Sequence, residues 1–546
     1  MKKILLLTFL ISSITFAQKA TTSKPKTPFV WGGANVYFLL TDRFYDGNKT
    51  NNHTYNRNKP TGELRGFNGG DIRGIIQKLD DGYFTKLGIN VIWMTPIVEQ
   101  IHDGVDEGNG FTYAFHGYWA RDWTALDPSF GTKKDLAELV KKAHAKGIRI
   151  MLDAVINHTG PVTPEDSVYP NDWVRTSPKC TYKSYETYIN CTLVDNLPDV
   201  KTESNEKVVL PPFLVKKWKK EGRYKQEIAE LDAFFKKTKY PRAPRFYIMK
   251  WLADYITDYG IDGYRVDTAK HTYENVWAEF KKVCDLAFAE FKINNPDKVL
   301  DKNPFFTVGE VYGYNIGGKK LYDFGDKKVN YFENGFTGLI NFDFRNEAKK
   351  PCEELFSKYS NILNSDLKGN TVMNYISSHD DGSPFDKKRE KTFESGTKLL
   401  LAPGISQVYY GDESARSLDI EGAQGDATLR SNMNWNEIKI NPETTKVLVH
   451  WQKLGLFRKN HPAIGAGIHK EISVSPYVFS RTFTKEKFTD NVVVGLDLPK
   501  GKKEIPVGTI FKNGTKLKDA YSGKSGVVTN GKVIIDSSFD LVLLEK

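Results

Sequence analysis

The sequence predicts an α/β fold: a (β/α)8 TIM barrel with an inserted domain after its third strand and a C-terminal antiparallel β-sandwich domain. Three observations predict it. A helical stretch that ends at glycine and leads into an apolar strand occurs three times, at Gly88, Gly147 and Gly260. Five further apolar runs bring the strands to eight, the number in a closed barrel of β/α units. After about residue 463 the pattern changes to short alternating runs separated by Gly, Lys and Asn, which is typical of a sandwich.

The composition is that of a large soluble globular protein. The chain has 546 residues, of which 40% are hydrophobic and 27% charged, and this excludes disordered, collagen-like and polytopic membrane proteins. The formal net charge is +11, spread along the chain with a local concentration at 216–220. Because no nucleic-acid-binding motif accompanies this charge, we interpret it as a solvated basic surface.

The N-terminus resembles an export signal. Lys2 and Lys3 precede an apolar run over 4–16, and Ala17 offers a small residue before a cleavage site at Gln18. The run is too short to span a membrane. We therefore expect a signal peptide over 1–17, a linker over 18–30, and a secreted protein, periplasmic or extracellular, with no membrane attachment after cleavage.

The barrel elements follow in two blocks. The first block, 31–157, contains expected strands at 36–40, 90–97 and 149–158, with a helix over 133–146. The second block, 244–462, contains a helix over 245–259 and strands at 262–267, 305–308, 338–342, 372–377 and 405–409. The stretch between the blocks, 158–243, is too long for a βα loop and is expected to form an inserted B domain, helical over 213–237. Residues 463–546 form the predicted sandwich domain.

The four cysteines fall into two groups. Cys180 and Cys191 lie in a polar, Tyr-rich stretch of the insertion, which favours a local disulfide in an exported protein without requiring one. Cys284 and Cys352 lie in amphipathic helical patterns and are expected to be buried free thiols.

Three carboxylates stand at the ends of predicted barrel strands. Asp267, Glu310 and Asp380 each follow an apolar run, so they should emerge into one pocket at the C-terminal face of the barrel. Arg265 alternates with Asp267 on the same strand face and would keep that carboxylate ionised. An ionised carboxylate suits a nucleophile, and a second, desolvated carboxyl suits a general acid; this pair performs glycoside hydrolysis. The alternative is a set of structural ion pairs.

The strand-end motifs carry a family resemblance. DAVINH, GYRVDTAKH, VGEV and SSHD resemble the four signature regions of the α-amylase family, glycoside hydrolase family 13, and LPDV at 197–200 resembles a fifth. The resemblance covers essentially the whole mature chain. It implies that Asp267 is the nucleophile, that Glu310 is the acid and then the base, and that Asp380 binds sugar hydroxyls and supports the transition state. It also implies retention of configuration.

The resemblance implies further substrate contacts. An HGYW segment at 116–119 would supply a stacking platform, although a packed core aromatic is the alternative for its tyrosine. A pair four residues apart at 426 and 430 would contact subsite −2, with a surface salt bridge as the alternative. The implied substrate-binding residues are His116, Tyr118, His158, Arg265, Lys270, His271, His379, Asp426 and Arg430.

Calcium is the cofactor that the resemblance implies. One Ca2+ would bridge the barrel and the insertion, held by Asn157, Asp199 and the backbone carbonyl of His271, which are oxygen donors. For Asp199 the alternative is a turn residue. Zinc-site spacings are absent, and Ser378 replaces an Asn that is typical of chloride-dependent members.

The function that these features imply is a secreted α-amylase that cuts internal α-1,4-glucosidic bonds of starch, glycogen and maltooligosaccharides. The Lys-His pair at 270–271 and the LPDV form favour this branch. Two alternatives stay open: a 4-α-glucanotransferase or maltogenic or cyclomaltodextrin-acting relative, and a non-catalytic glucan-binding protein. The expected partner is an α-glucan, with no nucleic acid, and the expected state is a monomer. No starch-binding module is recognisable.

Overall fold

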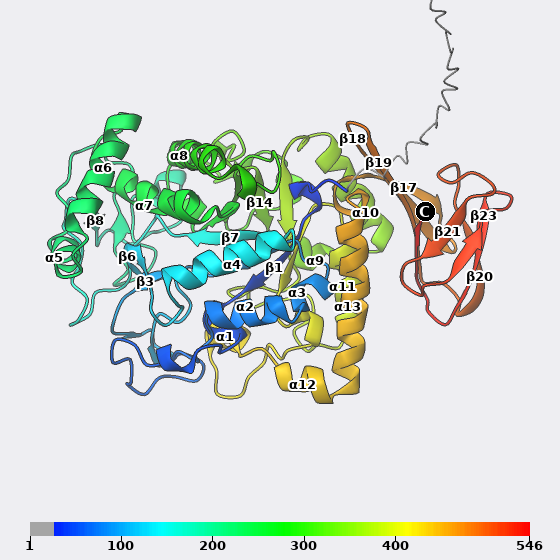
Figure 1. The fold of residues 1–546 in the computed structure, drawn as a ribbon, viewed down its shortest axis with the longest axis horizontal. Helices are drawn as coiled ribbons and strands as arrows, with labels where there is room; N and C mark the ends of the chain where they lie inside the picture. The colour runs from blue at the N-terminus through cyan, green and yellow to red at the C-terminus, as the bar shows by residue number, and fades with distance from the viewer. Residues whose placement is uncertain (1–26) are drawn as a thin grey trace, which may run out of the picture.

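The computed structural model describes residues 27–546 (Figure 1). The predicted signal peptide and most of the predicted linker lie outside the described residues. Within 27–546, no helix combines the length and apolarity needed to cross a bilayer.

Eight parallel strands close into a barrel, which confirms the predicted fold class. Every residue of these strands is buried, and strands buried on both faces appear in the sequence as continuous apolar runs, which is why all eight could be recognised. Around the barrel they are β1 (Asn35–Leu39), β2 (Val91–Met94), β7 (Arg149–Ala154), β10 (Gly263–Val266), β11 (Phe306–Gly309), β14 (Gly338–Asn341), β15 (Thr371–Asn374) and β16 (Ile405–Tyr409), which pairs with β1.

Helices surround the barrel, and their ends explain the sequence pattern. The helix α4 begins with a capping box between Thr132 and Asp135. The helix α7 ends at Gly260, whose φ of +74° and close approach to the Phe291 ring leave no room for a Cβ atom. The helices of the barrel blocks are α1 (Thr41–Phe44), α2 (Ile72–Asp80), α3 (Tyr83–Lys86), α4 (Lys133–Ala145), α7 (Pro244–Tyr259), α8 (Glu274–Asn294), α9 (Phe344–Glu347), α10 (Cys352–Asn364), α11 (Thr392–Leu401), α12 (Trp435–Ile440) and α13 (Pro442–Asn460).

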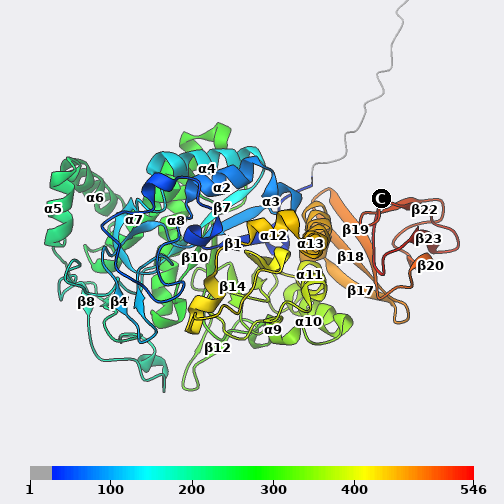
Figure 2. The same cartoon turned by 90° about the horizontal axis from the view of Figure 1, so that it is seen from below.

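Two long connections extend from the barrel at one end. The β2–α4 connection forms the antiparallel pairs β3 (Val98–Gln100) with β6 (Ala120–Leu126) and β4 (Val105–Asp106) with β5 (Phe111–Thr112). The insertion forms the pair β8 (Val174–Arg175) with β9 (Asp199–Val200), then α5 (Pro212–Lys220) and α6 (Tyr224–Thr238). The expected single helical stretch is therefore two helices, separated at Gly222, where φ is +75°. The insertion lies at the opposite end of the molecule from the C-terminal strands (Figures 1 and 2).

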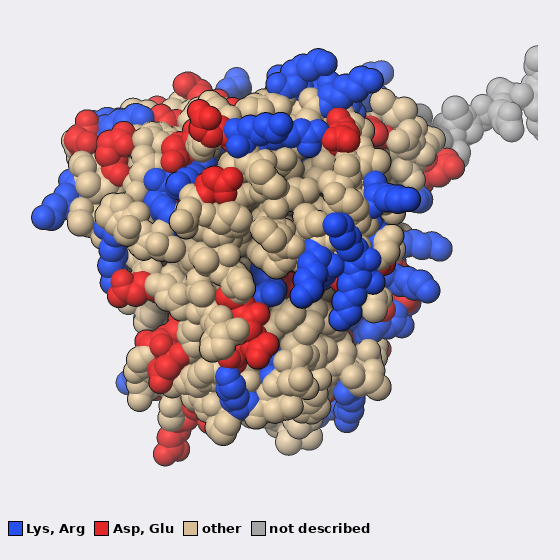
Figure 3. All heavy atoms as spheres, turned by 90° about the vertical axis from the view of Figure 1, so that its left-hand side faces the viewer, with Lys and Arg blue, Asp and Glu red and all other residues tan. Residues whose placement is uncertain are grey.

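The basic stretch of the insertion is not a uniform patch. Figure 3 shows acidic and basic side chains interspersed over the face that looks out from the insertion side. Within α5, Lys217 contacts the carboxylates of Glu99 and Asp122, which are themselves buried. Part of the local positive charge is thus used to bind the insertion to the β3–β6 pair.

The C-terminal region consists of antiparallel strands, as predicted. After α14 (Ala463–Ala466), one sheet has the order β17 (Ile468–Ser473), β18 (Tyr477–Lys485), β19 (Phe488–Leu496), β24 (Val542–Glu545), β21 (Lys516–Asp519), β22 (Ser525–Val527). The pair β20 (Gly501–Pro506) and β23 (Lys532–Ser537) packs with it around a separate apolar core. His461, at the end of α13, bonds Asp490 and Glu545 at 2.8 Å each and so joins the barrel side to this sheet.

Candidate active site

Three strand ends bring the predicted catalytic carboxylates together. Asp267 follows β10, Glu310 follows β11, and Asp380 lies in the loop after β15. Asp267 and Glu310 are 5% and 7% exposed, whereas the Asp380 side chain is 33% exposed. Two carboxyl groups therefore lie on the floor of the site, and the third is open to solvent.

One buried guanidinium organises this floor. Arg265 Nη1 donates to Asp267 Oδ1 at 2.6 Å and to Asp153 Oδ1 at 2.9 Å, and its Nη2 lies 2.6 Å from Glu310 Oε1. The other oxygen of Glu310 accepts a bond from the Thr268 backbone N–H. Asp267 and Glu310 are thus held side by side on a single cation.

The site gives its carboxyl groups different proton affinities. Burial raises the pKa of Glu310 well above its usual value, and the charges of Asp267 and Asp380 raise it further against the pull of Arg265. For Asp380, partial burial alone would raise the pKa, but His379, Arg265 and Arg430 outweigh it and hold the pKa below its usual value. Glu310 is therefore suited to carry a proton, and Asp380 to stay ionised.

Asp153 belongs to this network, although the sequence did not indicate it as a site residue. It lies opposite Arg265 in the β7–β10 register, and burial raises its pKa to about 7. The available signal was that Asp153 is the first residue of the DAVINH motif. A residue paired in register with Arg265 on the neighbouring strand must lie beside it.

Arg265→Met is expected to lower the free energy of unfolding by about 3–5 kcal/mol, because it leaves three buried carboxyls without their cation. Chemical denaturation measures this. The control is Lys142→Met, which removes partly exposed ion pairs with Asp80 and Glu138 and should cost under about 1 kcal/mol. Equal losses in the two variants would contradict the role of Arg265.

The predicted aromatic and histidine contacts form one wall of the site. Tyr118 donates its hydroxyl to Asp153 Oδ2 at 2.9 Å, and its ring stacks on His379 with centroids 5.3 Å apart. His158 Nε2 bonds the Tyr118 carbonyl, and His116 Nδ1 accepts from the Tyr118 N–H. Burial lowers the pKa of all three histidines, that of His379 to about 4, so the rings are neutral hydrogen-bonding groups.

The pair at 426 and 430 is connected to this wall. Arg430 Nη2 lies 2.7 Å from Asp426 Oδ2, while its Nε donates to the His379 carbonyl at 2.9 Å. Arg65, which the sequence did not indicate, also contacts Asp426. The arginine is buried, so the pair is more than an isolated surface salt bridge.

Lys270 and His271 follow Asp267 in a short helical turn and lie among aromatic rings. The Lys270 ammonium donates to the Tyr312 carbonyl at 3.1 Å and lies 4.4 Å from the Tyr188 ring centroid and 4.9 Å from that of Tyr322. Sequence reasoning missed these three tyrosines. Tyr312 could have been found, since it stands two residues after Glu310. Tyr322 lies further along the same connection and Tyr188 lies in the insertion, and neither stands in a recognisable motif.

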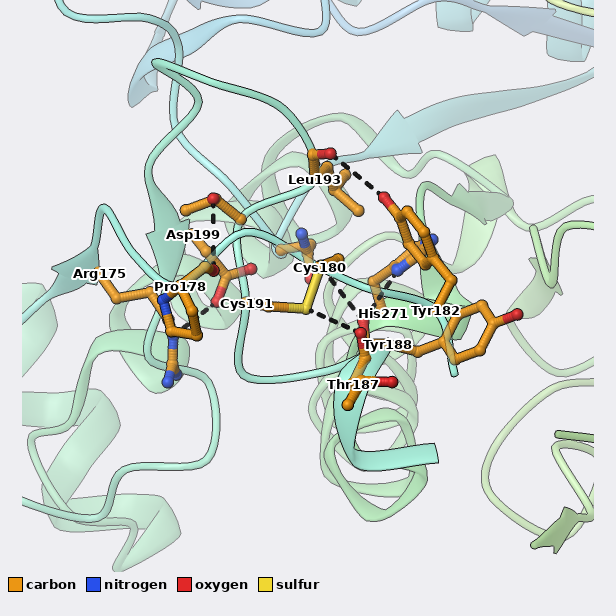
Figure 4. Close-up of a disulfide and its surroundings, with 12 residues drawn as sticks. Arg175, Pro178, Cys180, Tyr182, Thr187, Tyr188, Cys191, Leu193, Asp199 and His271 are labelled. Carbon is orange, nitrogen blue, oxygen red and sulfur yellow. Dashed lines mark hydrogen bonds and ion pairs between the residues drawn. A yellow bond between two sulfur atoms is a disulfide. The ribbon is translucent and has the colours of Figure 1, made fainter. Parts of the chain in front are cut away.

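A disulfide supports the Tyr188 segment, which confirms the favoured pairing. Cys180 and Cys191 are bonded, and Figure 4 shows this bridge beside Tyr182, Tyr188 and His271. His271 Nδ1 bonds the Tyr188 carbonyl at 2.9 Å. Of the two free cysteines, Cys284 is buried as expected, but Cys352 is only partly buried, because it stands in the first turn of α10 at the edge of a cavity.

Two of the predicted calcium ligands, Asn157 and Asp199, lie on neighbouring backbone segments, where the Val200 N–H bonds the Asn157 carbonyl. In residues 27–546 no cluster of three or more His, Cys, Asp or Glu side chains is placed to hold a metal. Asp199 Oδ2 accepts from Arg175 Nε, Asn157 Oδ1 accepts from the Thr272 hydroxyl, and the buried Asn157 Nδ2 has no partner. Turning the amide would let Nδ2 bond the hydroxyl and place an acceptor oxygen at the unpartnered position. Asn157 and Asp199 then offer oxygen ligands of the kind that Ca2+ prefers, with Asp199 Oδ2 already bonded to Arg175.

Comparison with known proteins places the chain among glucan-active enzymes. Residues 38–453 match the model of the α-amylase catalytic domain. The periplasmic α-amylase of Escherichia coli (strain K12) is 35% identical over 81% of this chain and 69% of its own length. A cyclomaltodextrin glucanotransferase of Thermoanaerobacterium thermosulfurigenes is 28% identical over 82% of this chain and 58% of its own.

Solved structures agree on the fold. The α-amylase of Geobacillus thermoleovorans complexed with acarbose superposes with a TM-score of 0.63 at 21% identity, covering 95% of this chain and all of that one. The γ-cyclodextrin-forming glucanotransferase of an alkalophilic Bacillus clarkii gives 0.64 at 22% identity, covering 94% and 70%. With the family match over most of its length, the chain belongs to the α-amylase family of glycoside hydrolases and glucanotransferases.

Proposed function

We propose that the protein is a secreted α-amylase that hydrolyses internal α-1,4-glucosidic bonds by a retaining double displacement. The observation that supports this most is the pairing of Asp267 and Glu310 on one guanidinium, with the pKa of Glu310 raised. Two adjacent carboxyls, one ionised and one protonated, are the requirement of that mechanism. The exported state rests on the predicted signal peptide and on the periplasmic relative.

In the proposed mechanism Asp267 attacks the anomeric carbon while Glu310 donates its proton to the leaving glycosidic oxygen. The covalent glucosyl–Asp267 ester forms and the aglycone leaves. Glu310 then removes a proton from a water molecule, which attacks the same carbon and releases Asp267. Asp380, held ionised, would bind sugar hydroxyls, and the neutral rings of His158 and His379 would add hydrogen bonds.

A glucanotransferase is the second candidate, and the aromatic surroundings of Lys270 favour it. Tyr188, Tyr312 and Tyr322 could hold a sugar acceptor as well as the departing half of a substrate. The non-catalytic alternative is disfavoured, because all three carboxylates are present at their strand ends.

Product analysis separates these candidates. Soluble starch and maltoheptaose are incubated with the enzyme, and products are resolved by chromatography over time. We expect rapid loss of iodine staining and the appearance of short maltooligosaccharides. Linear products longer than maltoheptaose, or cyclic products, would indicate a glucanotransferase instead. If no new reducing ends appear, hydrolysis is contradicted.

We propose further that Ca2+ binds at Asn157, Asp199 and the His271 carbonyl, where it would link the insertion to the barrel. At a hundredfold excess over Kd, such an ion contributes about 2.7 kcal/mol to stability. A chelator should therefore lower the melting temperature of the wild type and added Ca2+ restore it. Asp199→Asn should melt at nearly the same temperature in both conditions. A wild type that melts identically with chelator and with Ca2+ would contradict the proposal.

A further inference from the structure

A cavity of about 990 Å³ lies between the barrel and the C-terminal strands. Its barrel side is formed by α10, α11 and α13, and its other side by β18, β19 and the loops around 497–500, 521 and 538–541. Figures 1 and 2 both show these helices beside β17–β19. The loops that carry Asp267, Glu310 and Asp380 contribute nothing to its lining, so it is separate from the active site.

The cavity displays two exposed phenylalanine rings, and the other strongly exposed aromatic side chains among residues 27–546, Tyr182 and Tyr312, lie elsewhere. The chain has 33 phenylalanines, and Phe393 and Phe539 are the two most exposed of those within residues 27–546, at 46% and 36%. Both line this cavity, together with Tyr477 and Tyr521. Exposed aromatic rings concentrated in one cavity mark a binding site rather than a packing defect.

Polar contacts hold the Phe393 backbone and the Tyr521 side chain on opposite sides of the cavity. His450 bonds the Tyr521 hydroxyl through Nδ1 at 2.7 Å and the Phe393 carbonyl through Nε2 at 3.0 Å, so it ties the two sides of the cavity together. The Lys453 ammonium lies 4.4 Å from the Tyr521 centroid and 4.5 Å from that of Phe539. A rigid aromatic surface with a donor between its rings is preorganised for a ligand.

The charges around the cavity indicate a neutral ligand. Five carboxylates and four lysines line it, so neither a polyanion nor a polycation is favoured: Glu353, Glu394, Glu471, Asp497, Asp540, Lys398, Lys446, Lys453 and Lys500. Donors and acceptors of both signs suit a molecule with many hydroxyl groups, and aromatic faces suit the apolar faces of sugar rings.

We propose that this cavity is a second, non-catalytic binding site for an α-glucan chain. The choice of ligand rests on the proposed function, since a polymer substrate extends beyond an active site. The site would hold the polysaccharide through Phe393 and Phe539 while the barrel cleaves it elsewhere.

The test measures retardation of the full chain in native gels that contain amylopectin. All variants carry Asp267→Asn to prevent hydrolysis, and saturating acarbose occupies the active site. We expect retardation of this parent, and a loss of affinity of roughly three- to tenfold for each ring removed in Phe393→Ala and Phe539→Ala. Phe393→Tyr should retain binding, and the control Ile534→Ala, at a residue that is 50% exposed on β23, should match the parent.

Several outcomes would overturn the site. A Phe393→Ala/Phe539→Ala double variant that is retarded like the parent excludes it. A different result is a dimer for the parent and a monomer for the double variant in size-exclusion chromatography, with unchanged retardation in the gel. In that case the cavity is a contact between copies of the chain. Hydrolysis of starch by the wild type is measured separately, so failure of the proposed activity is distinguishable from failure of this site.

Discussion

Asp267→Asn is expected to lower kcat/KM for soluble starch on the order of 10⁴-fold or more, because the amide cannot form the glucosyl ester. The fold should persist, since Arg265 keeps its contacts with Asp153 and Glu310. Reducing-end assays give the rate, and thermal melting reports the fold. In the wild type, a slow fluorinated glucosyl substrate should leave a covalent mass increase on the peptide that contains Asp267.

Asp153→Asn is the matched control for this prediction. Asp153, on β7, accepts a hydrogen bond from the same Arg265 guanidinium and another from the Tyr118 hydroxyl. Its loss should reduce activity far less than the loss of Asp267. Comparable losses in both variants, or a covalent label on Asp380, would contradict the assignment of the nucleophile.

Glu310→Gln is expected to lower kcat/KM for unactivated glucans by about 10² to 10⁴-fold, because the leaving oxygen then departs without a proton. Release of fluoride from a maltosyl fluoride should be much less affected, since fluoride needs little protonation. A variant that loses both activities equally would indicate a structural role for Glu310.

The pH profile gives a second test of Glu310. The acid must be protonated to act, so wild-type kcat/KM should fall as pH rises through its raised pKa, and Glu310→Gln should lack this basic limb. Part of the upward shift comes from the Asp267 charge, which disappears when the ester forms. The pKa of Glu310 then falls, which suits its second role as a base. An unchanged basic limb in the variant would assign that limb to another group.

The strands of the barrel could be predicted from sequence because they are buried on both faces and therefore continuously apolar. The candidate catalytic carboxylates could be predicted because Asp267 and Glu310 directly follow such strands and Asp380 lies in the loop after another. Asp153 escaped prediction, since its role depends on the register between β7 and β10. Tyr188 and Tyr322 escaped for a different reason: they reach Lys270 from a disulfide-closed loop and a short hairpin, and no local pattern encodes that approach. The fold of the insertion around Arg175 and Asp199 could not be predicted either, because its strands are two residues long and too short to show a hydrophobic periodicity.

The tyrosines around Lys270 have a consequence for how this fold diversifies. The predicted bond-breaking groups Asp267 and Glu310 directly follow barrel strands, whereas Tyr188 belongs to the insertion and Tyr322 to a short hairpin in the connection after β11. Loops tolerate substitution and insertion far better than barrel strands do. Selection can therefore alter which molecule receives the glucosyl unit without disturbing the machinery that cleaves the bond. Exchanging the 180–191 loop is accordingly the place to start in converting a degrading enzyme into a synthetic one.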